Sequence, residues 1–147
     1  MRVVVQRVKS SSVKVNNVVV GKSGYGYLLL VSFTDGDNEE IIDYMVKKIC
    51  NLRIMDDECK VMNKSILDIK GSILSISQFT LYASCKKGNR PSYSNALSGE
   101  LASSLYKMFN QKLGKFVLVE TGIFGADMEV SLVNDGPITI LLEKEVE

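Results

Sequence analysis

The chain contains no histidine, and this absence excludes more chemistry than any other feature of the composition. Without an imidazole there is no Ser-His-Asp or Cys-His catalytic group and no histidine ligand for a metal. The three cysteines, Cys50, Cys59 and Cys85, include no C-x-x-C pair, so we expect free thiols in a reducing compartment and no disulfide framework or zinc site. We expect neither a metal nor a cofactor, and an enzyme of this composition must work without histidine.

Long apolar runs and an excess of one charge are also missing. No run approaches the roughly 20 apolar residues that cross a bilayer, and no signal peptide opens the chain, so we expect a cytoplasmic protein with no membrane partner. Lys and Arg number 18 against 17 Asp and Glu, so any contact with nucleic acid must be local. The 147 residues, 46% of them hydrophobic, suit a single domain over residues 1–147.

The order of the expected elements indicates the fold class. Alternating or continuous apolar residues predict strands over residues 2–15, 18–20, 27–33, 53–55, 72–77, 116–120, 128–134 and 138–143. Helical spacing predicts helices over residues 37–52 and 97–113, the first capped by Asp37 with Glu40 as its capping-box partner. Three glycines in residues 21–26 predict a glycine-rich hairpin, because no Lys-Ser/Thr pair and no helix follow them. We therefore predict an α+β domain in which two helices cover a mixed, antiparallel or barrel-like sheet.

Two polar segments stand at the ends of expected strands. Ser77-Gln78-Phe79-Thr80 follows an apolar strand, and its two hydroxyls and one amide are able to hydrogen-bond a substrate. The alternative is that these groups are satisfied locally. Asn134-Asp135-Gly136-Pro137 joins the last two strands and predicts a tight turn that proline makes rigid, with a plain hairpin turn as the simpler interpretation.

Two further segments suit a nucleotide. Lys86, Lys87 and Arg90 form the densest basic cluster of the chain, and a loop of this kind is able to hold phosphates. Phe124 and Met128 enclose a Gly-Ala-Asp segment, and an aromatic ring beside small residues makes a flat apolar slot for a base. Each segment has a simpler alternative, which is a solvated loop for the first and core packing for the second.

Six segments together resemble those of one family, the D-aminoacyl-tRNA deacylases, also called D-tyrosyl-tRNA deacylases. They are M-R-V-V-V-Q-R-V at 1–8, N-L-R-I at 51–54, S-Q-F-T-L-Y-A at 77–83, K-G-N-R-P-S-Y at 87–93, F-G-A-D-M at 124–128 and N-D-G-P-I-T at 134–139. Any one of these motifs is weak, and it is their order and spacing along nearly the whole chain that make the resemblance specific. The one variation is Ile138, where valine is commoner in the family. Exchange of these two apolar side chains changes the volume little and is usually tolerated.

The resemblance implies a homodimer that hydrolyses the ester between a D-amino acid, or glycine, and the 3′-terminal adenosine of tRNA. Such an enzyme clears mischarged tRNA before it reaches the ribosome. The resemblance also implies a cis Gly136–Pro137 peptide that reaches across the dimer into the partner's site. Its carbonyl oxygens would leave no room for an L side chain, so specificity would come from steric rejection. Arg7 would brace this turn.

The resemblance assigns roles to the remaining residues as well. Ser77 and Gln78 would fix the aminoacyl end, backbone amides near Phe79 and Thr80 would hold the oxyanion, and the substrate's own 2′-hydroxyl would help to activate water. Thr80 is then a binding or positioning group, and its rival role as nucleophile lacks an obvious base. Phe124 and Met128 would flank the terminal adenine, and Lys86, Lys87 and Arg90 would meet phosphates of the acceptor stem.

Two other functions remain open at this point. One is a nucleic-acid-associated homodimer that uses the basic loop without turnover. The other is a different hydrolase on the same scaffold, acting on small esters of D-amino acids. Comparison of free esters with charged tRNA separates the hydrolases, and salt-sensitive affinity without hydrolysis would indicate the binding protein.

Overall fold

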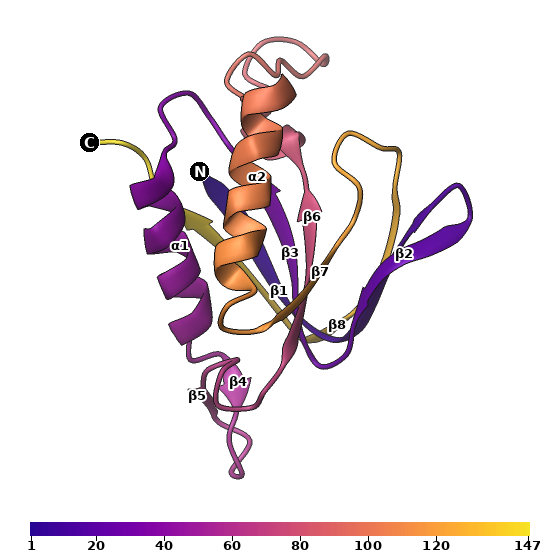
Figure 1. The fold of residues 1–147 in the computed structure, drawn as a ribbon, viewed down its shortest axis with the longest axis vertical. Coiled ribbons are helices and arrows are strands. Elements are labelled where there is room, and N and C mark those ends of the chain that lie inside the picture. Colours follow the sequence, from indigo (N-terminus) through magenta and orange to yellow (C-terminus); the bar gives the residue numbers. More distant parts are fainter.

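A curved six-stranded sheet carries two helices side by side on one face (Figure 1). The computed structural model describes residues 1–147. The elements in chain order are β1 (Arg2–Val15), β2 (Val18–Ser23), β3 (Gly26–Ser32), α1 (Glu39–Asn51), β4 (Met55–Asp56), β5 (Met62–Lys64), β6 (Ser72–Ser77), the 3₁₀ helix η1 (Phe79–Tyr82), α2 (Gly99–Leu113), β7 (Leu118–Thr121) and β8 (Glu129–Glu143). Neither helix is long and apolar enough to cross a membrane. The α+β class with two helices on one sheet is as predicted.

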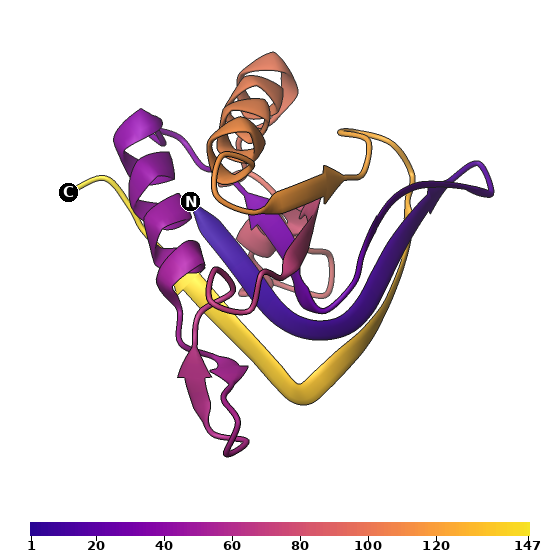
Figure 2. The ribbon, with the colours of Figure 1, turned by 60° about the horizontal axis from the view of Figure 1, so that its bottom comes forward.

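Strand β1 is the centre of the sheet. Its whole length pairs with β8 on one edge, while β3 and then β2 follow one another along the other edge, all antiparallel to it. Strand β6 pairs with β3, and β7 with β6, in parallel. The sheet curls until β2 approaches β7, where a Cβ added to Gly21 would lie 2.5 Å from the carbonyl oxygen of Thr121. The sheet is therefore mixed and nearly closed, like a barrel (Figure 2).

The glycine-rich segment is not a hairpin, and that prediction was wrong. Strands β2 and β3 run in the same direction along β1 and are joined by a bend, because the chain has already reversed at Asn16 and Asn17. Both asparagines have positive φ (49° and 63°), as a tight two-residue hairpin requires. Gly26 instead permits close contact between strands, since a Cβ there would lie 1.9 Å from the carbonyl oxygen of Ser72 on β6.

The helix starts also differ from the predictions. Asn38, and not Asp37, caps α1, with its side-chain oxygen accepting from the Ile41 amide at 3.1 Å. Asp37 is used elsewhere: its carboxylate accepts from the Met1 ammonium and from the Thr34 amide, each at 2.8 Å. Helix α2 begins at Gly99, two residues later than predicted, because the Leu97 amide donates to the Phe33 carbonyl and so belongs to the connection with β3.

The last two predicted strands form one continuous strand. Residues 135–137 were expected to turn the chain, but β8 passes through them without reversing and stays paired with β1 on both sides. Gln6 pairs with Thr139, but Val8 pairs with Asn134. Residues 135–138 of β8 therefore lie opposite Arg7 alone and form an enlarged bulge. Figure 2 shows that β8, in yellow, bends sharply along its length. The Gly136–Pro137 peptide is cis, as the resemblance implies.

The core lies between the two helices and the sheet. The apolar residues at helical spacing in α1 face this core: Ile41, Ile42, Met45, Val46 and Ile49 are buried, and Leu52 at the C-cap is partly buried. A smaller apolar cluster lies inside the curl of the sheet and consists of Val8, Val13, Leu28, Leu74 and Ile76. Strands β4 and β5 form a separate two-stranded ribbon beyond the C-terminal end of α1 (Figure 1).

Candidate functional site

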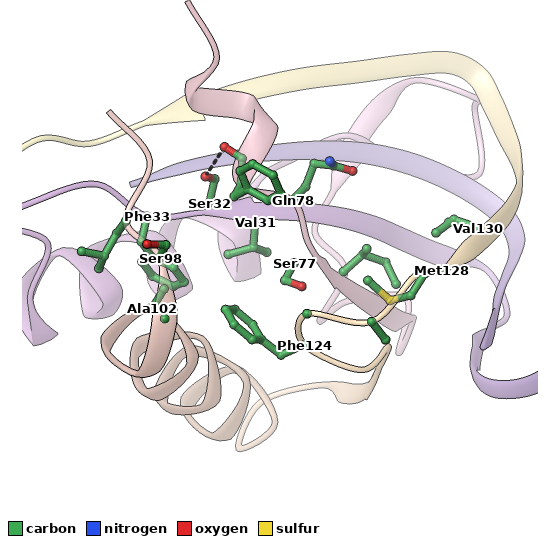
Figure 3. A pocket seen from close by; sticks show the side chains of 16 residues that line it. Val31, Ser32, Phe33, Ser77, Gln78, Ser98, Ala102, Phe124, Met128 and Val130 are labelled. Atoms are coloured by element: carbon green, nitrogen blue, oxygen red, sulfur yellow. Dashed lines mark hydrogen bonds between the residues drawn. The ribbon is translucent and has the colours of Figure 1, made fainter. Parts of the chain in front are cut away.

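A cavity of about 340 Å³ lies at the carboxyl ends of two parallel strands (Figure 3). Val31 of β3 and Ser77 of β6 are register partners, so the polar segment that follows β6 comes directly beside the end of β3. The start of α2 and the loop after β7 close the cavity. Its lining consists of Val31, Ser32, Phe33, Ile76, Ser77, Gln78, Phe79, Leu97, Ser98, Gly99, Ala102, Phe124, Gly125, Ala126, Met128 and Val130.

The cavity brings together residues of two motifs that are far apart in the sequence. Ser77, Gln78 and Phe79 come from the end of β6, whereas Phe124 and Met128 come from the loop between β7 and β8. Figure 3 shows Phe124 below Ser77, with Met128 to the right of both. The predicted proximity of these residues is therefore present in one chain. One wall is polar and the other is largely apolar, which suits a ligand with both characters.

The backbone after β6 leaves two amide donors free, one at Phe79 in the lining of the cavity and one at the following residue, Thr80. The Gln78 amide donates to the Val31 carbonyl at 2.8 Å, and the Ser32 hydroxyl donates to the Phe79 carbonyl at 3.4 Å (Figure 3). The amides of Phe79 and Thr80 begin the 3₁₀ helix η1, and neither donates a hydrogen bond within the chain. Free amides at such a position are suited to hold an anionic oxygen.

Thr80 lies next to the cavity but is not among the residues that line it. Its hydroxyl oxygen accepts from the side-chain amide of Gln78 at 2.6 Å. No carboxylate or amine contacts this hydroxyl, so no neighbouring base is in place to deprotonate it. The geometry is that of a group which positions Gln78, and it offers no activation of a nucleophile.

Two aromatic pairs hold the walls of the cavity. The Phe124 ring packs on Tyr106 with centroids 5.8 Å apart, and Tyr106 donates to the Ser75 carbonyl at 2.8 Å. Burial raises the pKa of Tyr106 above its usual value, so the hydroxyl keeps its proton and remains a donor. Phe79 meets Tyr93 edge to face at 5.2 Å, which joins the cavity to the loop that follows η1.

The contributions of β3 and α2 to the cavity were not predicted from the sequence. Val31, Ser32 and Phe33 end the strand that was predicted over residues 27–33. Ser98 is the N-cap of α2, and Ala102 lies in its first turn. The apolar run up to Phe33 was a signal for a buried strand. Its parallel pairing with β6 depends on residues more than 40 positions apart, and no local pattern reveals it.

Gly136 and Pro137 lie outside the cavity of their own chain and are exposed. The bulge that carries them is held at its base by Asn134, whose side-chain amide donates to the carbonyls of Arg7 and Ile138 at 2.9 and 3.0 Å. This role of Asn134 was not predicted from the sequence, although an asparagine beside a Gly-Pro pair is a common signal for a fixed turn.

Arg7 is buried beneath the same bulge, with 4% of its surface exposed. Its guanidinium donates to the Ile54 carbonyl at 2.8 Å and to the Asp56 carboxylate at 3.0 Å. The Nε atom also lies 3.2 Å from an Asp135 carboxylate oxygen. Arg7 thus links the bulge of β8 to the ribbon of β4 and β5.

The basic loop projects beyond η1. The amides and carbonyls of Ser84 and Ser92 pair at 2.8 and 2.9 Å and close this loop at its base. Lys86, Lys87 and Arg90 are exposed on it, and none of them forms an ion pair. These three unpaired cations are available for an anionic partner.

Comparison with known proteins agrees with this geometry. A solved structure titled "c-Myc DNA Unwinding Element Binding Protein" is 39% identical, with a TM-score of 0.93 over 99% of this chain and 100% of that one. A second, described as a probable eukaryotic D-amino acid tRNA deacylase, is 19% identical, with a TM-score of 0.81 over 96% of this chain and 97% of that one, and shows the same fold. The family model for D-Tyr-tRNA(Tyr) deacylase matches residues 4–143. Since that match spans nearly the whole chain, the protein belongs to the D-Tyr-tRNA(Tyr) deacylase family, as its motifs predict.

Proposed function

We propose that the chain hydrolyses the ester bond of D-aminoacyl-tRNA, and of mischarged glycyl-tRNA, releasing the amino acid and the tRNA. The observation that carries this proposal is the cavity in which Ser77, Gln78 and Phe79 face Phe124 and Met128, in a member of this family. The polar side suits the aminoacyl group, and the aromatic side suits the terminal adenine.

The reaction needs little side-chain acid–base chemistry. A water molecule adds to the ester carbonyl, and the free amides of Phe79 and Thr80 are placed to hold the oxyanion that forms. The added water gives up a proton through the neighbouring 2′-hydroxyl. The oxyanion then re-forms the carbonyl as its bond to the 3′-oxygen breaks, and the 3′-oxygen leaves with that proton. Because aminoacyl esters are already activated, orientation and oxyanion stabilisation supply much of the rate without histidine.

The rejection of L-amino acids is assigned to Gly136 and Pro137 of a second copy. Their position outside their own cavity supports this assignment, because they are exposed and free to reach another chain. The same strand exposes apolar side chains at Val133 and Leu141, which suit burial between two copies. Backbone carbonyls cannot move aside as a flexible side chain does, so they would exclude an L side chain sterically.

The stereospecific reaction is tested by deacylation of D-tyrosyl-tRNA and L-tyrosyl-tRNA under the same conditions. The expected result is hydrolysis of the D-ester at least about 100-fold faster, a difference of about 2.7 kcal/mol. Equal rates would contradict the proposal. D-Tyrosine ethyl ester serves as the control, because efficient hydrolysis of this small ester would indicate a hydrolase that does not require the tRNA.

Replacement of Thr80 separates the two mechanisms. In Thr80→Ala the Gln78 side chain loses its partner at 2.6 Å, and we expect the rate to fall by no more than about tenfold, as for loss of one hydrogen bond. Single-turnover hydrolysis of D-tyrosyl-tRNA measures this rate. A fall of more than about a thousandfold with unchanged tRNA binding would instead identify Thr80 as the nucleophile.

A second candidate function is nucleic-acid binding without turnover. Two observations favour it: the 39% identical structure is named for binding a DNA unwinding element, and Lys86, Lys87 and Arg90 are unpaired. Salt-dependent affinity for DNA with no hydrolysis of either tyrosyl ester would support this function. Under the deacylase proposal the same three cations meet phosphates of the acceptor stem, and their replacement by glutamine weakens tRNA binding and reduces its salt dependence.

A further inference from the structure

A second hollow, of about 390 Å³, adjoins the cavity and has no role in the proposed reaction. It lies between α2 and β7, and Phe124 lines both spaces. The ring of Phe124 therefore stands between the cavity and this hollow, so the two spaces are neighbours. On the side of α2, the lining residues Tyr106, Lys107 and Asn110 share one face of the helix.

The hollow contains a polar atom without a partner. The side-chain oxygen of Asn110 is buried and accepts no hydrogen bond. Tyr106 cannot supply one, because its single hydroxyl proton is donated to the Ser75 carbonyl at 2.8 Å. A buried acceptor left unpaired is unfavourable, so a ligand that donates a hydrogen bond to it is expected to bind more tightly.

The hollow also presents a free positive charge. Lys107 is exposed, lines the hollow and takes part in no ion pair. The other cation of this helix, Lys112, differs in this respect, because it is bound to Glu39 and Asp43 at 2.7 Å each. A cation beside an unpaired amide oxygen matches two parts of a nucleotide, the phosphate and the edge of the base.

We propose that this hollow binds the nucleotide that precedes the terminal adenosine of tRNA, which is a cytidine in every tRNA. The proposal rests on the proposed function, since it assumes that the adenosine occupies the cavity beside Phe124. The Asn110 amide carries an acceptor and a donor, which complement the amino group and N3 of cytosine. Lys107 then contacts the phosphate that joins the two nucleosides.

The test compares two small substrates. One is the D-tyrosyl ester of adenosine, and the other is the D-tyrosyl ester of the dinucleotide CpA, which adds only the preceding cytidine and its phosphate. For the unmodified chain we expect KM to be at least about tenfold lower for the CpA ester, as a bidentate base contact allows. Lys107→Gln and Asn110→Leu should each reduce this advantage while leaving hydrolysis of the adenosine ester unchanged.

Lys115→Gln is the matched control, because Lys115 lies near the same helix but does not line this hollow. It should keep the full CpA advantage. Equal KM values for the two esters in the unmodified chain, or an advantage that both hollow variants retain, would overturn the proposal.

Binding of CpA and of adenosine, followed by NMR shifts of the Lys107 and Asn110 amides, decides the question even if neither ester is hydrolysed. Shifts with CpA alone support the site, and no shift with CpA overturns it, whereas failure to hydrolyse either ester counts against the proposed function.

Discussion

Gly26→Ala is expected to destabilise the protein by about 4 kcal/mol or more, a loss found only where a substitution disrupts the interior. A Cβ at this position would lie 1.9 Å from the carbonyl oxygen and 2.8 Å from the nitrogen of Ser72. Both are backbone atoms of β6, so the clash cannot be relieved by rotation of a side chain. Strands β3 and β6 would have to separate, and this pair carries the two sides of the cavity at Val31 and Ser77.

Gly24→Ala is the matched control in the same glycine-rich segment. The nearest atom to a Cβ at Gly24 is the Ser72 hydroxyl oxygen at 3.9 Å, which is an ordinary contact. We expect a change in the free energy of unfolding within about 1 kcal/mol. Urea denaturation of both variants gives the comparison. Similar losses in the two variants would show that the segment needs glycine for a reason other than the approach of β3 to β6.

Ala102→Phe is expected to abolish deacylation, with a fall of at least about a thousandfold. Ala102 lies in α2, is 4% exposed and lines the cavity, so a phenyl ring there would occupy space assigned to the adenosine or the aminoacyl group. An enlarged side chain in a packed place costs about 1–3 kcal/mol of stability, which leaves a domain of ordinary stability folded. Circular dichroism and single-turnover hydrolysis of D-tyrosyl-tRNA separate loss of folding from loss of the site.

Ser104→Phe adds the same ring two residues further along α2, at an exposed position that does not line the cavity. It should deacylate D-tyrosyl-tRNA at the rate of the unmodified chain. A folded Ala102→Phe variant with full activity would show that the reaction takes place outside this cavity.

Local patterns in the sequence were sufficient for much of the fold. The apolar spacing of α1 and the valines of β1 identify those elements because each follows from the period of its own backbone. The glycine-rich segment was misread because glycines mark turns and close approaches alike, and only the position of β6 distinguishes the two. The bulge at Gly136 was interpreted as a turn for a related reason. The strand continues through the bulge only because β8 pairs with β1 on both sides of it, and no neighbouring residue encodes that pairing.

The same distinction between local sequence patterns and contacts of distant segments applies to the site. The polar segment at Ser77 and the apolar one at Phe124 are visible as motifs in the sequence, and their resemblance to those of one family predicts that both serve a single site. The contribution of β3 to the lining of the cavity depends on its parallel pairing with β6. The hollow beside Asn110 depends on the packing of α2 against β7. Both arise from contacts between segments far apart in the chain, which composition and spacing do not show.

The central claim, that one copy carries the cavity while the other supplies the barrier to L-amino acids, is tested by mixing two defective chains. In Gly136→Ala a Cβ would lie 2.8 Å from the Ile138 side chain, and the residue would have to adopt a φ of 119°. We expect this displacement of the barrier to permit hydrolysis of L-tyrosyl-tRNA. The chain with Ala102→Phe has a blocked cavity but an intact barrier.

The decisive measurement is the rate of L-tyrosyl-tRNA hydrolysis by Gly136→Ala after exchange of subunits with an excess of Ala102→Phe chains. The account predicts that this rate falls while hydrolysis of the D-ester continues, because each open cavity then faces an intact Gly-Pro segment. An excess of chains that carry both substitutions is the control. These chains supply no intact Gly-Pro segment, so hydrolysis of the L-ester should continue at the rate of Gly136→Ala alone. Hydrolysis of the L-ester that is unchanged by the Ala102→Phe chains would contradict the account.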